Sequence, residues 1–432
     1  MPWLFVAVAA WGALFTFLSY RPITRPPFLM GFSFFGAWLT TELALFHIAW
    51  QVAATVAFIA LGALGSWPGW LGLAIALASW VALALSVRGA LRTDALFARA
   101  LGDESGRPSP TEWSRVWMPF HFRRRGVSRI KDIQYVDDGH TRHRLDIYRP
   151  AVGAERAPVL FQIHGGGWMI SKKTQQALPL MYQMASQGWV CVAINYSLSP
   201  RATWPDHLVD CKRALAWVRA HITEYGGDPQ QVVVTGGSAG GHLTAMMGLT
   251  ANQPQWQPGF EDADTTVQGM VPIYGVYDWT GSTGGGRRDN GLRRVLERYV
   301  IKQKYADAPA VFREASPLYQ VHADAPPALV IHGTLDTLAP VHEARRFVED
   351  LRAVSRKPVA YVELRGAHHA FEVFNSIRAL AAIRGISTFL ETLVIGDRSP
   401  AGAQSRSAGG PVRTGEPVGA ATDPTPTART AP

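Results

Sequence analysis

The sequence predicts an α/β fold, in which a mostly parallel central sheet is flanked by helices, preceded by an α-helical transmembrane region. Two observations predict this arrangement. Residues 1–87 carry only three formal charges, Arg21, Arg25 and Glu42, within long apolar runs. From about residue 131 onward, short apolar runs typical of buried strands alternate with stretches of helical periodicity.

Residues 1–90 are expected to form about three transmembrane helices. Pro2–Tyr20 is long enough to cross a bilayer core of about 30 Å, and Leu71–Val87 is a further candidate. Phe28–Leu64 is long for one span and tight for two, and Glu42 interrupts it. A cleaved signal peptide is the alternative for the first segment, which lacks a basic start. Glu42 or His47 could be functional inside a membrane, but no second polar segment offers a partner, which favours a helix-contact or interfacial role.

Basic residues flank the apolar segments. Arg21 and Arg25 mark one short loop. A second group follows the last apolar segment: Arg88, Arg92, Arg99 and Arg123–Arg125. The positive-inside tendency places both groups in the cytoplasm, which requires three crossings of the cell membrane and a cytoplasmic soluble domain. Four crossings would place that domain outside.

The net charge of +9 would draw a membrane-tethered protein to anionic lipid headgroups. Residues 91–130 form a basic linker or cap segment next to the membrane. Nucleic-acid binding is the rival explanation of the charge, and it is not favoured because no recognition module appears. The two cysteines, Cys191 and Cys211, give no disulfide framework. The sequence has neither metal-ligand spacing nor a nucleotide-binding fingerprint, so we expect no cofactor and no metal.

Residues 131–395 carry the pattern of the soluble domain. The first two of its strand-like runs are expected to pair antiparallel near Asp138-Gly139. The runs are Ile133–Val136, Arg144–Tyr148, Pro158–Ile163, Trp189–Asn195, Gln231–Thr235, Gln268–Tyr274, Ala328–Ile331 and Val359–Leu364. Helical patterns such as His207–Tyr225 and His342–Val354 lie between most of them.

Two stretches depart from this alternation. Residues 277–326 are too long for an ordinary connection, and their middle, Leu292–Tyr305, is basic and helical in pattern. We expect a lid over the substrate pocket there, to which residues near 97–125 could contribute; the alternative is a surface excursion without substrate contact. Residues 396–432 are rich in Gly, Ala, Pro, Ser and Thr and are expected to form a disordered tail.

The most specific motif is Gly236-Gly237-Ser238-Ala239-Gly240, directly after the apolar run Val232–Thr235. A G-x-S-x-G motif between a strand and a helix is the signature of a nucleophile elbow, a turn so sharp that the serine hydroxyl projects from the sheet. Glycines two residues before and after the serine tolerate the close approach of strand and helix. Similar loops can hold phosphates, but the lysine of a phosphate-binding loop is missing.

A glycine loop lies upstream. His164-Gly165-Gly166-Gly167 follows the buried strand pattern Val159–Ile163. Such a stretch after an early strand supplies backbone N–H groups to an oxyanion hole, and each donor is worth roughly 3 kcal/mol of transition-state stabilisation. The alternative is a plain glycine turn, which the elbow downstream makes less favoured.

An acid and a base follow in order. Asp336 lies just past the seventh strand-like run, where a carboxylate can orient a histidine on a neighbouring loop. It could instead cap the next helix, and Asp210 and Glu363 are weaker competitors. His368 and His369 follow the last strand-like run. Both fit the order Ser, acid, His that recurs in α/β-hydrolases, so this order leaves open which of them is the base.

Five ordered motifs within residues 130–392 resemble the α/β-hydrolase esterases related to hormone-sensitive lipase, and within these the membrane-anchored bacterial carboxylesterase/lipase group. The motifs are His164–Trp168, Asn195–Pro200, Gly236–His242, His332–Asp336 and His369–Phe371. The resemblance implies an α/β-hydrolase fold with Ser238 as nucleophile, His369 as base and Asp336 as the acid that orients it. It also implies three backbone oxyanion donors: Gly165, Gly166 and Ala239.

Two departures leave the triad intact but leave the subfamily open. Gly237 stands where the hormone-sensitive lipase group commonly has an acidic residue, and Gly333-Thr334-Leu335-Asp336 replaces the more usual Asp-Pro-Leu-x-Asp. The resemblance implies a membrane-anchored serine carboxylic ester hydrolase that forms an acyl-enzyme from a small-molecule or lipid ester. An amide-type hydrolase such as a kynurenine formamidase-like enzyme is the alternative, because it shares similar motifs. A non-catalytic binding scaffold would not require all three triad residues.

Overall fold

The computed structural model describes residues 1–25, 27–102, 110–284 and 290–398. Residues 1–393 form one unit and residues 394–432 a second, and the sheet and the N-terminal helices belong to the first. The expected tail at 396–432 therefore lies outside the described residues, except for 396–398, which end the last helix.

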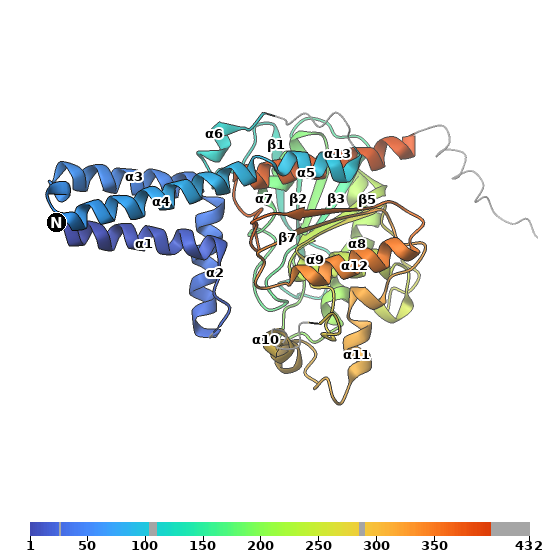
Figure 1. The fold of residues 1–432 in the computed structure, drawn as a ribbon. Coiled ribbons are helices and arrows are strands. Elements are labelled where there is room, and N and C mark those ends of the chain that lie inside the picture. Colours follow the sequence, from blue (N-terminus) through green and yellow to red (C-terminus); the bar gives the residue numbers. More distant parts are fainter. Residues whose placement is uncertain (26, 103–109, 285–289, 399–432) are drawn as a thin grey trace, which may run out of the picture. The chain divides into compact units, whose positions relative to one another are not determined.

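An eight-stranded sheet forms the centre of the soluble domain, with the strand order β1-β2-β4-β3-β5-β6-β7-β8 (Figure 1). The strands are β1 (Val127–Gln134), β2 (Arg144–Pro150), β3 (Ala157–Ile163), β4 (Val190–Ile194), β5 (Gly227–Gly237), β6 (Gly269–Ile273), β7 (Ala328–Gly333) and β8 (Val359–Leu364). β1 pairs antiparallel with β2, and β2 with β4, whereas all other pairs are parallel. The prediction of a mostly parallel sheet with an antiparallel first pair is confirmed.

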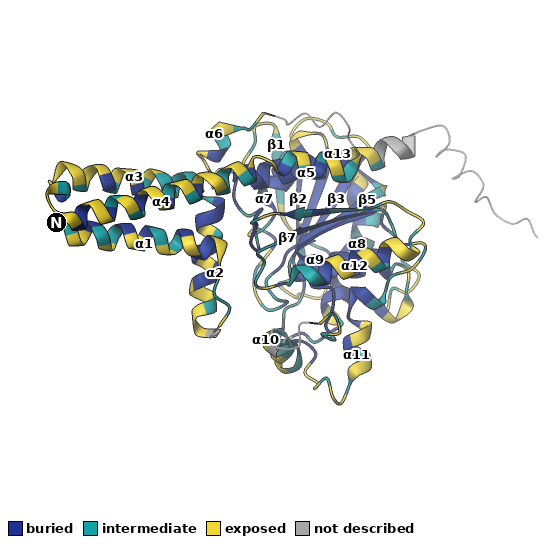
Figure 2. Cartoon of the chain, in the orientation of Figure 1, coloured by how far each residue is buried: buried dark blue, intermediate teal, exposed yellow. Residues whose placement is uncertain are grey.

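The boundary of the first strand was wrong. β1 begins at Val127 rather than Ile133, and Val127 pairs with Pro150 of β2. Its early residues mix polar and apolar side chains and are only half-buried, since an edge strand has one free side and need not carry an apolar pattern. The central strands β4, β6 and β7 are buried along their whole length (Figure 2), as expected for parallel strands covered on both faces.

Helices cover the sheet and connect its strands. They are α7 (Leu178–Ser186), α8 (Asp206–His221), α9 (Ala239–Leu249), α12 (Val341–Val354) and α13 (Ile377–Arg398). The predicted motifs follow the ends of four strands, β3, β5, β7 and β8. Ile163 of β3 pairs with Gly236 of β5, and Gly333 of β7 pairs with Leu364 of β8. Because β3, β5, β7 and β8 run parallel, the loops after them emerge at the same edge of the sheet.

The insertion at 277–326 is less helical than its pattern indicated. It contains α10 (Asn290–Val295), a π-helical turn (Leu296–Val300), α11 (Pro309–Glu314) and a short 3₁₀ turn (Pro317–Tyr319); residues 285–289 lie outside the described residues. The expected helix Leu292–Tyr305 ends at Val300, because Lys302 has a left-handed φ of 62° that a helix cannot accommodate. Residues near 97–125 form α5 (Thr93–Leu101) and the single turn α6 (Trp113–Val116).

The N-terminal region forms four helices: α1 (Pro2–Tyr20), α2 (Pro27–Glu42), α3 (Ala44–Ala60) and α4 (Trp67–Ala90). In Figure 1, α1, α3 and α4 run side by side, while α2 crosses their end beside the soluble domain. By length and composition, two helices of the described chain could cross a membrane, Pro2–Tyr20 and Trp67–Leu101. The pair α2 and α3 would add a third span if counted as one, but it bends by 91° between Glu42 and Ala44. Most of Phe28–Leu64, which is long for one span and tight for two, thus lies in two helices. α3 runs beside α1 and α4, and α2 crosses their end (Figure 1).

Candidate active site

Ser238 occupies a strained turn between β5 and α9. Its backbone angles are φ 59° and ψ −123°, a region that few residues other than glycine adopt. A Cβ atom at Gly240 would collide with the carbonyl oxygen of Ile163, and one at Gly236 would lie 2.5 Å from the same oxygen. The two glycines therefore let α9 pack directly behind β5 and β3. The Ser238 side chain lies on the tip of this turn and is partly exposed.

Tyr274 explains why glycine stands at position 237. A Cβ atom at Gly237 would meet the Tyr274 ring, 2.7 Å from its Cζ. Tyr274 itself has a left-handed φ of 37°, and its ring centre lies 4.5 Å from that of His369. Tyrosine thus fills the space into which an acidic side chain at 237 would extend.

The glycine loop lies directly against the elbow. A Cβ atom at Gly165 would be 2.9 Å from the Ser238 Cβ, so only glycine permits this contact. The backbone N–H of Gly165 donates to Gln176 Oε1 at 2.5 Å and is therefore occupied in this arrangement. The N–H groups of Gly166 and Ala239 have no acceptor among the described residues.

His164 holds the conformation of this loop. It is fully buried and stacks on Tyr196, with ring centres 4.4 Å apart. The Arg142 guanidinium, which can only donate, lies 3.0 Å from His164 Nε2, so Nδ1 carries the proton and donates to the Gly165 carbonyl at 2.7 Å. Burial lowers the pKa of His164 to about 3, which keeps the ring neutral and this tautomer fixed.

Asp336 and His369 form a buried hydrogen-bonded pair. His369 Nδ1 lies 2.7 Å from Asp336 Oδ2, while Asp336 Oδ1 accepts the N–H groups of Leu338 at 2.9 Å and Ala339 at 2.8 Å. Burial alone would raise the pKa of Asp336, but His369, His332 and the backbone N–H of Ala339 together hold it below its usual range. The carboxylate is therefore charged at neutral pH and fixes the orientation of the imidazole.

The competing residues are engaged elsewhere. His368 Nε2 lies 2.9 Å from the carbonyl oxygen of Ser19 in α1. Asp210 accepts the Ser197 N–H at 2.9 Å and pairs with His143 at 3.1 Å. Glu363 is bound by Arg345. Asp336 is thus bonded to His369 and not to His368. Gly237, the residue before Ser238, and His369 both lie against Tyr274.

Comparison with known proteins identifies the family of the chain. A family model described as BD-FAE matches residues 145–351. The chain is 42% identical over 412 residues to LipM of Mycobacterium tuberculosis, a probable carboxylic ester hydrolase, with 89% of this chain and 92% of LipM covered. The chain belongs to this family of carboxylic ester hydrolases.

Two further likenesses agree with this assignment. Esterase LipQ of the same organism is 46% identical over 269 residues, which cover 62% of this chain and 63% of LipQ. The structure of the thermophilic esterase Est2 of Thermogutta terrifontis with butyrate bound has a TM-score of 0.51 and 25% identity, covering 62% of this esterase and 94% of that chain. The protein is an enzyme of the α/β-hydrolase fold that hydrolyses carboxylic esters.

The N-terminal helices of this esterase touch the histidine loop, which the motifs gave no reason to expect. Trp38 of α2 donates from Nε1 to the Ala370 carbonyl at 2.9 Å and stacks on Phe374 at 4.9 Å. The Phe34 ring, also in α2, has its centre 6.5 Å from that of His369. Both aromatics lie in an apolar segment, where their only sequence signal is membrane-like composition.

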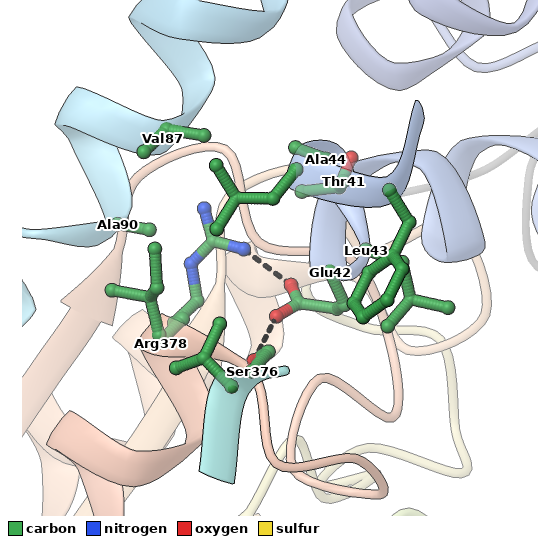
Figure 3. Close-up of a pocket in the computed structure, with 12 residues that line it drawn as sticks. Thr41, Glu42, Leu43, Ala44, Val87, Ala90, Ser376 and Arg378 are labelled. Carbon is green, nitrogen blue, oxygen red and sulfur yellow. Dashed lines mark hydrogen bonds and ion pairs between the residues drawn. The ribbon is translucent and has the colours of Figure 1, made fainter. Parts of the chain in front are cut away.

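A buried ion pair joins α2 to the catalytic half of the esterase. Arg378 donates to Glu42, and Ser376 donates to the other Glu42 oxygen at 2.6 Å (Figure 3). The side chains of Glu42 and Arg378 are 1% and 2% exposed. These groups line a pocket at the bend between α2 and α3. The partner that Glu42 lacked in the apolar sequence lies more than three hundred residues away, at the start of α13.

Proposed function

We propose that the esterase cleaves esters through an acyl-enzyme on Ser238, with His369 as general base and Asp336 as the carboxylate that orients it. The observation that carries this proposal is the convergence of three loops at one sheet edge. The strained elbow exposes the Ser238 hydroxyl, the glycine loop abuts it, and the His369–Asp336 pair stands beside it through Tyr274. These are the parts that acyl transfer requires.

The steps follow from these roles. His369 takes the Ser238 proton as Oγ attacks the ester carbonyl, and then gives it to the leaving alcohol. Asp336 stabilises the imidazolium through Nδ1. Water then attacks the acyl-enzyme by the same sequence and releases the acid.

The oxyanion would be held by backbone N–H groups of Gly166 and Ala239. Gly165 is a third donor only after Gln176 releases its N–H. Each well-placed donor contributes roughly 3 kcal/mol to transition-state stabilisation. The neutral His164 ring, bonded to the Gly165 carbonyl, fixes the peptide plane that carries the Gly166 N–H.

The insertion would act as a cap over the acyl side. Trp279 packs edge-on against Trp168 of the glycine loop at 4.8 Å, and its ring stacks on His242 of α9 at 4.6 Å. His242 Nε2 lies 2.7 Å from the Ala315 carbonyl. The cap, the glycine loop and the helix behind Ser238 therefore share one aromatic cluster.

The esterase would cross the cell membrane three times, by α1, α3 and α4. With α2 placed crosswise, the loop with Arg21 and Arg25 and the segment after α4 emerge at the same end of the bundle. The positive-inside tendency puts that end, and the catalytic domain with it, in the cytoplasm.

The test uses full-length enzyme in detergent and a series of p-nitrophenyl esters from acetate to palmitate, followed by a fluorophosphonate probe. Hydrolysis together with probe attached to Ser238, located by mass spectrometry, supports the proposal. N-formylkynurenine serves as the counter-substrate. Hydrolysis without modification of Ser238, or turnover of the formamide in place of the esters, would overturn it.

A further inference from the structure

We propose that α2 lies in the plane of the membrane interface and forms a wall between the lipid and the active site, so that the enzyme takes its ester directly from the bilayer. The substrate class is an amphiphilic ester whose acyl chain resides among lipid tails. This inference rests on the proposed function, because it places the lipid surface next to Ser238 and His369.

The orientation of α2 follows from the bend between α2 and α3. α1, α3 and α4 run side by side, and α2 meets α3 at 91°. If the three apolar helices stand along the bilayer normal, α2 must run parallel to the bilayer surface. It does so at the end of the bundle that carries the catalytic domain.

One stripe of α2 faces outward and is apolar along its length. Phe28, Phe32, Phe35 and Leu39 follow each other at helical spacing, and they are 79%, 47%, 56% and 36% exposed. Residues at such spacing share one helix face. An exposed apolar stripe of this length marks an interaction surface. Its continuity with α1 and α4, which could cross a membrane by length and composition, points to the lipid bilayer as the occupant.

A second exposed apolar patch lies on the segment around α6. Trp113, Trp117, Met118 and Phe120 are exposed in the segment after α4 and α5. The Trp117 ring packs on Phe46 at the start of α3, and Phe120 packs on Phe374. Aromatic side chains collect at headgroup depth in membrane proteins. Exposed arginines at 21 and 25, beside α2, match anionic headgroups.

The adjacent stripe of α2, about 100° around the helix from the exposed one, faces the reaction centre. Phe34 and Trp38 contact the loop of His369, Ala370 and Phe374. Phe34 is 9% exposed, whereas its neighbour Phe35 is 56% exposed. Because a helix with its side chains is about 10 Å across, the catalytic base lies only one helix diameter from the lipid. An ester at headgroup depth can therefore reach Ser238 while most of its acyl chain stays in the bilayer.

The position of α2 is tested with full-length enzyme in phosphatidylcholine–phosphatidylglycerol vesicles. Phe35→Cys carries a bimane fluorophore, and Val152→Cys is the matched control. Val152 is 89% exposed and follows β2; because β2 runs antiparallel to β4, it lies at the sheet edge opposite the catalytic loops. The native Cys191 and Cys211 are buried and do not react. We expect nitroxide-labelled lipid to quench bimane at 35 but not at 152, and aqueous iodide to do the reverse. Equal iodide quenching at both positions would overturn the proposal.

The route of the ester is tested by surface dilution. p-Nitrophenyl palmitate is held in the vesicles at constant amount while the lipid is increased, and p-nitrophenyl acetate is supplied from water. We expect palmitate hydrolysis to follow the mole fraction in the bilayer, and the Phe32→Lys/Phe35→Lys variant to lose about tenfold on palmitate but less than about twofold on acetate. Equal losses on both esters, or a palmitate rate that ignores dilution, would refute the route. Absence of acetate hydrolysis by the unmodified enzyme would instead refute the proposed function.

Discussion

The catalytic loops and the N-terminal helices meet at one segment, residues 366–378, yet they are built on different principles. Each proposed catalytic group follows the end of a strand, so the register of the sheet places the loops of Ser238, Asp336 and His369 at one edge. The helices reach the same segment through scattered single contacts from Ser19, Trp38 and Glu42. Local motifs with fixed backbone geometry determine the first region, whereas packing between distant residues determines the second.

The two adjacent histidines give the sharpest test of this contrast, and the largest effect. His369→Ala removes the proposed base and should lower kcat for p-nitrophenyl butyrate by about 10⁶-fold. His368→Ala removes a bond to α1 worth about 0.5–1.5 kcal/mol and should leave activity within about tenfold. Steady-state kinetics on both purified variants measure the two kcat values. A larger loss of kcat in His368→Ala than in His369→Ala would assign the base to His368.

The acid can be separated from its competitor in the same way. Asp336→Asn leaves the fold in place but favours the wrong tautomer of His369, and we expect kcat to fall by about 10⁴-fold. Glu363→Gln, which alters a half-exposed pair with Arg345, is the matched control and should change kcat by less than about threefold, since surface pairs contribute little. Comparable losses in the two variants would contradict the assignment.

The helix contacts should appear in stability rather than in chemistry. Glu42→Ala leaves the Arg378 guanidinium buried and uncompensated, which should cost about 3–5 kcal/mol of unfolding free energy. Asp94→Ala breaks a second ion pair between an N-terminal helix and α13, the pair of Asp94 with Arg384. The side chains of Arg384 and Asp94 are 21% and 16% exposed, and loss of this pair should cost about 0–1 kcal/mol of unfolding free energy. Urea unfolding in detergent micelles measures both losses of free energy. Equal losses would show that burial does not make the Glu42–Arg378 pair more stabilising than the Asp94–Arg384 pair.

Gln176 offers the smallest effect. Its side chain occupies the Gly165 N–H, and a hydrogen bond of this kind has a net worth of about 0.5–1.5 kcal/mol. Removing it in Gln176→Ala should free the third oxyanion donor and raise kcat by about 2–10-fold with KM unchanged. A fall in kcat would mean that Gln176 supports the loop more than it blocks it.

The sequence predicted the parts whose geometry is local. The sharp turn at Ser238, the glycine loop and a mostly parallel sheet with an antiparallel first pair follow from glycine spacing and apolar runs. The order of the strands in the sheet, in which β4 lies between β2 and β3, was not predicted, because it depends on pairing between distant segments. The bond from Gly165 to Gln176 and the packing of Tyr274 against Gly237 were not predictable, because each depends on groups that meet only after folding. The same holds for α2: apolar composition cannot distinguish a helix that crosses a bilayer from one that lies across its end.

The ion pair between Glu42 and Arg378 has a consequence for how the chain could be divided. A proteolytic cut between α5 and α6 would separate helices α1 to α5 from the part of the chain that forms the sheet. Removing these helices would strip the histidine loop of the Ser19 carbonyl, the Trp38 indole and the only carboxylate that Arg378 contacts among the described residues. The N-terminal helices therefore support the loop that carries His369 from inside the fold, and they are not a tether that can be discarded.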